Sequence, residues 1–294
     1  MRSACIDIGS NTTRLLVAEP NGAGLREVLA RRMFVPLIHG PRGEIDPETV
    51  GVLASVVAAH AATARECGAR RVQAVATAAV REAGNCEALC AALEREAGLR
   101  VRVLSADEEA RLAFAGATGT LAVPPTGTLG VVDVGGGSSE LVTGTVAGGV
   151  EWYASLRVGS GVLTERHVRA DPPAPRELDA LRAEAEGAFG AIRAPRPVAA
   201  YAVGGSATSL RLLCGDVLSG AALDRALDTL AAWPVREAAD RLGLARERVR
   251  LLPAGLALLR AAARAFGDLP LEVARGGLRE GVLLEDFAAP PAGS

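Results

Sequence analysis

The sequence predicts an α/β protein built from two copies of one unit. Segments with strand-like alternation and segments with helical periodicity follow one another along the 294 residues, which is typical of α/β folds. Residues 7–16 (DIGSNTTRLL) match residues 133–142 (DVGGGSSELV) at an offset of 126, and 74–77 match 202–205 at an offset of 128. Two matches at nearly one offset indicate an internal duplication, and we expect a cleft between the copies.

In the first copy, helix signals follow a set of strands. Asp46 is a suitable N-cap with Pro47 at the first helical position, and Gly68 is a suitable stop for the helix between them. The alternation of apolar residues predicts three antiparallel strands before that helix. The expected elements are strands 4–9, 13–19 and 25–37, helix 47–67, strand 70–76, helix 86–97, strand 99–104 and helix 106–117.

The second copy repeats this order after the proline pair Pro124-Pro125, which places the boundary near residues 119–126. Strands are expected at 128–134, 139–146 and 150–158, and a helix at 176–192. The last residues, 289–294, are expected to form a disordered tail.

Composition excludes several function classes. All 32 basic side chains are arginine, so neither a Walker A lysine nor a Schiff-base lysine is available. A net charge of −2 and 3% aromatic residues argue against nucleic-acid binding, and three scattered histidines argue against a zinc cluster. Five cysteines without a CxxC pair indicate a reduced, cytoplasmic protein. Arginines interrupt every apolar run before about 18 residues, so no membrane span is expected.

Each copy carries a strand that ends in aspartate and is followed by small residues. Such a turn exposes several backbone N–H groups and can hold phosphate oxygens, although one turn alone could be an ordinary glycine hairpin. Asp7 and Asp133 are oxygen ligands suited to Mg²⁺; Glu140 is a third candidate, or else a solvated residue of an edge strand. The candidate phosphate-binding residues are Gly9, Ser10, Asn11 and Thr12 in the first turn and Gly135, Gly136, Gly137 and Ser138 in the second.

A third turn and two arginines extend this prediction. Gly204, Gly205 and Ser206 join a strand to a helix start that could hold an anion, or they form a plain turn. Arg14 follows the first turn and Arg81 begins the helix after 70–76. Without lysine, such guanidinium forks are the side chains that can bind phosphate, unless these two are ordinary surface arginines.

Residues 105–111 (SADEEAR) hold three adjacent acids, which capping rules separate. Ser105 and Glu108 fit a capping box, and Asp107 suits the positive end of the helix dipole. Glu109 has no such local role. We therefore assign Glu109 to chemistry, as the group that orients or deprotonates an attacking water, the alternative being a solvated glutamate on the helix surface.

Together these segments resemble the exopolyphosphatase and guanosine pentaphosphate phosphohydrolase (Ppx/GppA) family of the sugar kinase, Hsp70 and actin superfamily. The resemblance rests on DIGSNTTRLLV at 7–17, ATAAVREAGN at 76–85, SADEEARLAFAGA at 105–117, DVGGGSSELV at 133–142, AVGGSATSL at 202–210 and GGLREGVLLE at 276–285.

The resemblance implies two actin-like, ribonuclease H-like lobes, one formed by residues 1–121 with a helix at about 278–288 and the other by 122–277. It implies a catalytic role for Glu109, a phosphate contact for Arg81, Mg²⁺ as cofactor, and polyphosphate or guanosine pentaphosphate as substrate. Longer members carry an additional helical domain, and this chain resembles the short two-domain form. A homodimer is compatible with the pattern.

Two other functions remain open at this point. A kinase of the same superfamily would transfer phosphate to an acceptor and would need an aspartate base in an acceptor pocket. A non-catalytic module that senses nucleotide or polyphosphate would share the fold, because a fold alone does not prove activity.

Overall fold

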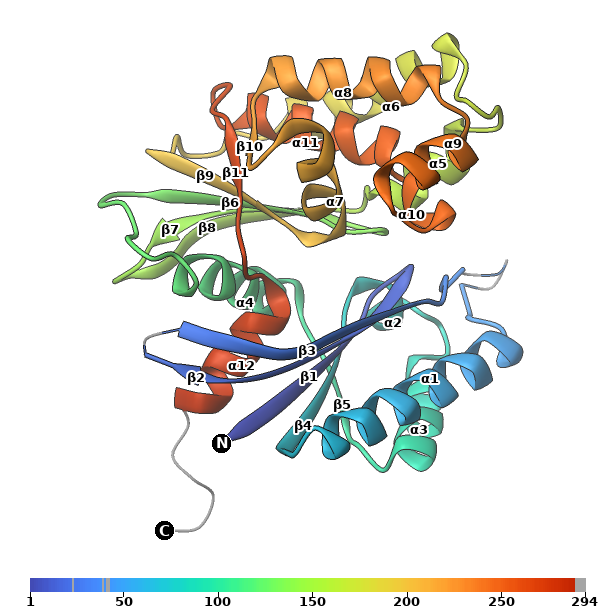
Figure 1. The fold of residues 1–294 in the computed structure, drawn as a ribbon, viewed down its shortest axis with the longest axis vertical. Helices are drawn as coiled ribbons and strands as arrows, with labels where there is room; N and C mark the ends of the chain where they lie inside the picture. Colours follow the sequence, from blue (N-terminus) through green and yellow to red (C-terminus); the bar gives the residue numbers. More distant parts are fainter. Residues whose placement is uncertain (23, 39, 41–42, 289–294) are drawn as a thin grey trace. The chain divides into compact units, whose positions relative to one another are not determined.

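The structure, a computed structural model, describes residues 1–288 except 23, 39, 41 and 42, so the predicted tail at 289–294 lies outside the described residues. The chain divides into two compact units (Figure 1). The first unit comprises Met1–Thr120 and the chain from Gly276 onward, and the second comprises Leu121–Arg275.

The first unit contains a five-stranded sheet in the order β3-β2-β1-β4-β5. Its strands are β1 (Arg2–Ile8), β2 (Thr12–Asn21), β3 (Gly24–Phe34), β4 (Ala69–Ala76) and β5 (Val101–Val103). β2 runs antiparallel to both of its neighbours, whereas β1, β4 and β5 are parallel.

Helices cover both faces of this sheet. The buried faces of α1 (Pro47–Glu66) and α3 (Cys86–Ala97) share a core with Ile6, Leu15 and Val17. On the other face, α4 (Ala106–Gly119) and α12 (Leu278–Ala288) pack on Cys5, Leu16 and Val75. Because successive strand residues point to opposite faces, Ile6 and Cys5 enter different cores. The single turn α2 (Ala78–Arg81) follows β4.

The second unit contains a six-stranded sheet in the order β10-β11-β9-β6-β7-β8. The strands are β6 (Leu129–Val134), β7 (Ser139–Thr145), β8 (Gly149–Leu156), β9 (Ala199–Val203), β10 (Val217–Leu218) and β11 (Leu271–Val273). The helices are α5 (Ser160–His167), α6 (Pro175–Gly190), α7 (Gly204–Cys214), α8 (Gly220–Ala232), α9 (Val235–Leu242), α10 (Arg246–Arg250) and α11 (Leu252–Ala265). α11 is buried along most of its length and packs against α6 and α8.

The two sheets repeat one topology, which confirms the predicted duplicated α/β fold. The order β8-β7-β6-β9-β11 has the same sequence of antiparallel and parallel pairings as β3-β2-β1-β4-β5. β10 is an extra antiparallel strand at one edge of the second sheet. Each unit therefore buries its own sheet between helices around its own core.

The predicted elements are present, with differences at their ends. The strand expected at 25–37 ends at Phe34, because Val35 and Leu37 donate backbone hydrogen bonds to Asn11 and Ser10 at 3.1 and 2.7 Å. These bonds attach the segment after β3 to the first glycine turn. The five cysteines, all among the described residues, are free thiols.

Glycines allow α4 and α12 to approach closely. A Cβ on Gly116 would lie 1.8 Å from the carbonyl oxygen of Gly277, and a Cβ on Gly281 would lie 1.9 Å from that of Leu112. This contact attaches the chain's last described helix to the first unit. In the described part of the chain, no helix is long and apolar enough to span a membrane.

Candidate active site

The carboxyl ends of β1, β4 and β5 meet at one edge of the first sheet. Ile8 pairs with Ala76, which pairs with Val103, and the backbone N–H of Thr77 donates to Ile8 at 3.2 Å. The first glycine turn, the turn containing Arg81 and the start of α4 therefore begin at this edge. In α/β sheets, ligands bind beyond the carboxyl ends of parallel strands.

The first glycine turn presents hydrogen-bond donors. The N–H of Gly9 donates to the carbonyl of Thr12 at 3.1 Å, which closes the turn. Within the described residues, the N–H groups of Ser10 and Asn11 donate to no backbone carbonyl, and the buried Nδ2 of Asn11 has no partner. Thr12 lies in β2 and is buried. The donor groups of this turn are therefore backbone N–H groups, the Asn11 amide and the Ser10 hydroxyl.

Asp7 lies next to two arginines from different parts of the chain. Arg14 is its cross-strand partner on β2, and Arg279 comes from α12. Burial raises the pKa of Asp7, while the charges of Arg14 and Arg279 oppose that rise and the nearby Glu280 adds to it. Sequence reasoning missed Arg279; the only signal for it was its position within the segment 276–285.

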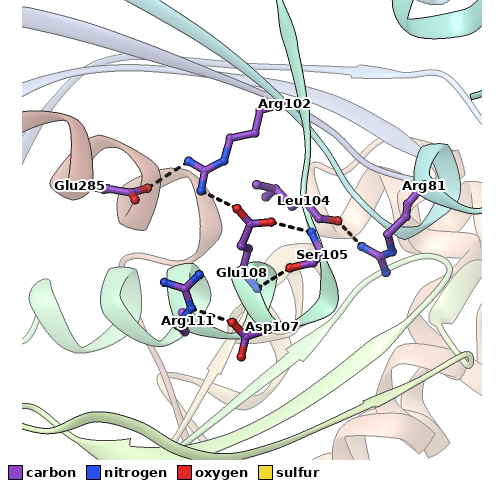
Figure 2. A network of polar contacts seen from close by, with 8 residues as sticks. All are labelled: Arg81, Arg102, Leu104, Ser105, Asp107, Glu108, Arg111 and Glu285. Atoms are coloured by element: carbon purple, nitrogen blue, oxygen red, sulfur yellow. Dashed lines mark hydrogen bonds and ion pairs between the residues drawn. The ribbon is translucent and has the colours of Figure 1, made fainter. Parts of the chain in front are cut away.

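Two of the three adjacent acids of α4, Asp107 and Glu108, have the local roles that the sequence predicts (Figure 2). Ser105 Oγ accepts from the N–H of Glu108 at 3.2 Å and Glu108 Oε2 accepts from the N–H of Ser105 at 2.9 Å, which confirms the capping box. Hydrogen bonds from the Ser105 backbone and then from Arg102 lower the pKa of Glu108 to about 2. Asp107 is exposed and accepts from Nε of Arg111 at 2.9 Å.

Glu109 has different surroundings. It is only 7% exposed, so it is not a solvated glutamate of the helix surface. Its Oε1 accepts a hydrogen bond from Nη1 of Arg81, and the same Nη1 donates to the carbonyl of Leu104 at 2.6 Å (Figure 2 shows the Leu104 bond). The structure thus brings together two residues that lie 28 positions apart and that the sequence nominated separately.

The second glycine turn repeats the first. The N–H of Gly135 donates to the carbonyl of Ser138 at 3.0 Å, and the start of α5 donates to the carbonyls of Gly135 and Gly136 at 2.9 Å. A Cβ on Gly159 would lie 2.5 Å from Gly136, so this approach requires glycine. Among the described residues, the N–H groups of Gly136, Gly137 and Ser138 donate to no backbone carbonyl.

Asp133 and Glu140 form a pair of carboxylates. They are cross-strand partners on β6 and β7, and Glu140 Oε1 accepts from Ser155 Oγ at 3.0 Å. Glu140 is 6% exposed, so it is not a solvated residue of an edge strand. Gly204 begins α7 with φ +87°, and a Cβ there would lie 2.5 Å from Asp133 Oδ1. The third turn therefore passes directly beside the aspartate of the second.

Ser206 contributes differently from the glycines before it. It is 1% exposed, its Oγ is buried without a hydrogen-bond partner, and a Cβ on Gly255 would lie 2.7 Å from that oxygen. The hydroxyl thus packs against α11. Of the predicted set Gly204, Gly205 and Ser206, Gly204 is the least buried.

The carboxylates best placed to bind a cation form a pair and not a larger cluster. Across the described residues, no group of three or more histidine, cysteine, aspartate or glutamate side chains could hold a metal ion. Asp133 and Glu140 offer two carboxylates on adjacent strands. That set fits Mg²⁺, which commonly takes one or two protein carboxylates and completes its shell with water and substrate phosphates.

Comparisons with known proteins agree with this architecture. The sequence profile of the Ppx/GppA phosphatase family matches residues 39–289. The chain is 30% identical to exopolyphosphatase 1 of Mycobacterium leprae, over 100% of this chain and 92% of that protein. It is 26% identical to guanosine-5'-triphosphate,3'-diphosphate pyrophosphatase of Pseudoalteromonas translucida, over 95% of this chain and 58% of that protein. The crystal structure of the Aquifex aeolicus Ppx/GppA family member superposes with a TM-score of 0.81 at 29% identity, covering 98% of this chain and 97% of that one.

Proposed function

The chain belongs to the Ppx/GppA phosphatase family, and on that premise we propose that it hydrolyses terminal phosphoanhydride bonds. The substrates are polyphosphate, guanosine pentaphosphate or both, and the product is inorganic phosphate. The observation that carries the proposal is the buried Glu109, held by Arg81 at the edge of the sheet where the first glycine turn begins.

Glu109 acts on the attacking water. A carboxylate positioned at a helix start can accept a proton from water as the water oxygen bonds to the terminal phosphorus and the bond to the leaving phosphate breaks. Arg81 fixes the orientation of that carboxylate, and its remaining N–H groups can contact a phosphoryl oxygen. Glu108 and Asp107 do not compete for this role, because they cap and flank the helix.

The two glycine turns bind phosphate oxygens. Both present backbone N–H groups that have no backbone acceptor among the described residues, and the first adds Nδ2 of Asn11. Arg14 and Arg279 add positive charge next to the first turn. In a protein without lysine and with net charge −2, these groups can provide the positive potential that a polyanion requires.

Asp133 and Glu140 would hold the cation, and Ser155 orients Glu140 by donating to its Oε1. When bound, Mg²⁺ would neutralise charge on the phosphoryl oxygens. Gly204 leaves room beside the Asp133 carboxylate that a larger residue would fill.

Replacement of one carboxylate tests the assignment. Because Glu109→Gln keeps the shape and loses the base, we expect kcat for phosphate release to fall by about 100-fold or more while KM changes little. Asp107→Asn is the matched control on the same helix turn, because Asp107 is exposed and forms its ion pair with Arg111 of the same helix. The proposed role is wrong if Glu109→Gln and Asp107→Asn retain similar rates.

A second assay addresses the substrate. Phosphate release is measured side by side on long-chain polyphosphate and guanosine pentaphosphate, with Mg²⁺ and with EDTA, and without any acceptor. We expect release from at least one substrate in Mg²⁺ only. Release that requires an added acceptor would identify a kinase, and tight binding without release would identify a sensing module.

A further inference from the structure

A second site lies in the first unit, away from the glycine turns. A pocket of about 600 Å³ is bounded by Arg31 to Met33 on the edge strand β3 and by the facing side of α1 between Val52 and Thr63. Its apolar wall includes Met33, Val52 and Val56. Met33 and Val52 are 49% and 50% exposed, which is unusual for large apolar side chains on one small area.

The charge of this pocket is one-sided. Arg31 lines it, and no lining residue carries a carboxylate. Arg31 and Arg32 are neighbours on one strand, so their side chains point to opposite faces of the sheet. The charge of Arg31 acts on His60 of α1, whereas Arg32 is the cross-strand partner of Arg14 and interacts with Arg279 of α12. In the described part of the chain, Arg31 forms no ion pair, whereas several other arginines of the first unit do. A guanidinium group with no acid beside it favours an anion.

His60 adds a hydrogen-bond acceptor to the pocket. The side chain is 4% exposed, and its Nε2 is buried without a partner. Burial lowers the pKa of His60, and the charge of the neighbouring Arg31 lowers it further. A hydrogen bond to the Thr13 backbone raises the pKa and partly offsets this decrease. A neutral ring that makes this bond through Nδ1 carries no proton on Nε2, so Nε2 accepts. An unsatisfied buried acceptor is costly, and a ligand donor would relieve that cost.

We propose that this pocket binds a small amphiphilic anion. The apolar body packs on Met33, Val52 and Val56, the acidic group binds Arg31, and an N–H or O–H of the ligand donates to Nε2 of His60. This combination of apolar walls with few polar anchor groups is typical of small-molecule sites. The proposal does not depend on the hydrolase reaction, because none of these residues belongs to the phosphate-binding set.

A matched pair of dyes tests the chemistry on the full chain. 8-Anilinonaphthalene-1-sulfonate has two apolar ring systems, one N–H and one sulfonate, and N-phenyl-1-naphthylamine is the same molecule without the sulfonate. We expect the sulfonate dye to bind at one site per chain, about tenfold or more tighter than the neutral dye, because of charge-assisted hydrogen bonds to arginine. Fluorescence titration of the folded protein measures both affinities.

Paired variants locate the site. Arg31→Gln should remove most of the preference for the sulfonate dye, while Arg65→Gln, on α1 outside the pocket, should retain it. Ala59→Trp fills the pocket and should abolish binding, while Ala62→Trp on the same helix should not; both alanines are exposed, so folding is preserved. Equal affinity of the two dyes for the wild type, or equal dye binding by Ala59→Trp and Ala62→Trp, would overturn the proposal.

Discussion

The two glycine turns have the same backbone hydrogen bond, but the residue opposite their aspartate differs in charge. Gly9 donates to Thr12 as Gly135 donates to Ser138, at 3.1 and 3.0 Å, and each turn follows an aspartate at the end of a strand. The cross-strand partner of that aspartate is Arg14 in the first unit and Glu140 in the second. The position opposite the aspartate is therefore a positively charged side chain in the first copy and a negatively charged one in the second.

This difference suggests a division of labour. In the first copy, Arg14 and Arg279 lie near Asp7, and we propose that these guanidinium groups contact phosphate directly. In the second copy, Asp133 and Glu140 are cross-strand partners, and we propose that they contact phosphate through a bound cation. The sequence expectation that Asp7 is also a metal ligand remains a prediction. The proposal that Asp133 and Glu140 are metal ligands has the support of their cross-strand pairing.

Among the variants that test this division, Asp133→Asn should have the largest effect on phosphate release. Loss of one of the paired carboxylates should lower phosphate release about 100-fold at limiting Mg²⁺ and raise the Mg²⁺ concentration for half-maximal rate. Rates measured across a Mg²⁺ titration provide the check. Glu151→Gln, an exposed acid on β8 of the same sheet, is the control and should leave the titration unchanged.

Arg14→Gln should show the opposite profile. Removing the guanidinium beside Asp7 should raise KM by about tenfold, since one bidentate phosphate contact is lost, and leave the Mg²⁺ requirement unaltered. Initial-rate kinetics at several Mg²⁺ concentrations separate the two quantities. A shift of the Mg²⁺ midpoint comparable to that of Asp133→Asn would contradict the division between the turns.

Gly204→Ala tests the space beside Asp133. The added Cβ would meet Asp133 Oδ1 at 2.5 Å and the residue would retain a positive φ, so we expect a loss of about 1–2 kcal/mol of folding stability together with reduced activity. Urea unfolding provides the stability. Gly187→Ala is the control: Gly187 lies within α6 with nothing near its Cβ position, and alanine there should stabilise by about 0.5–1 kcal/mol.

The helix starts near the two turns should differ in pH sensitivity. Carbonyls of the glycine turn accept from the start of α5, whereas α4 depends on Glu108. The folded-state pKa of Glu108, about 2, lies below its ordinary value of 4.5, so its contribution is full above pH 4.5 and is lost as pH falls towards 2. Glu108→Gln should remove about 1 kcal/mol of this acid-dependent stability. Thermal unfolding at pH 7 and pH 3 measures it; an unchanged pH dependence in Glu108→Gln would contradict the assignment.

Local rules explain why much of this site was predictable. The capping box at Ser105 and Glu108 depends on residues three apart, so spacing alone identified it and left Glu109 for another role. The duplication was visible because both copies retain the same turn chemistry. Three features were not predictable: the approach of Arg279 to Asp7, the burial of Ser206 against Gly255, and the position of the buried His60 at the wall of a pocket. Each depends on helices that pack from distant parts of the chain.

The sequence by itself determined the α/β class, the duplicated unit, the glycine turns and the separation of three adjacent acids, because hydrophobic period, turn chemistry and capping act over a few residues. Only the tertiary structure decided which charges meet. Arg81 reaches Glu109 because β4 and β5 end at one edge of a sheet, and Arg279 reaches Asp7 because glycines let α12 pack tightly on α4. Such contacts are set by the register of strands and the depth of helix packing, which no local pattern specifies.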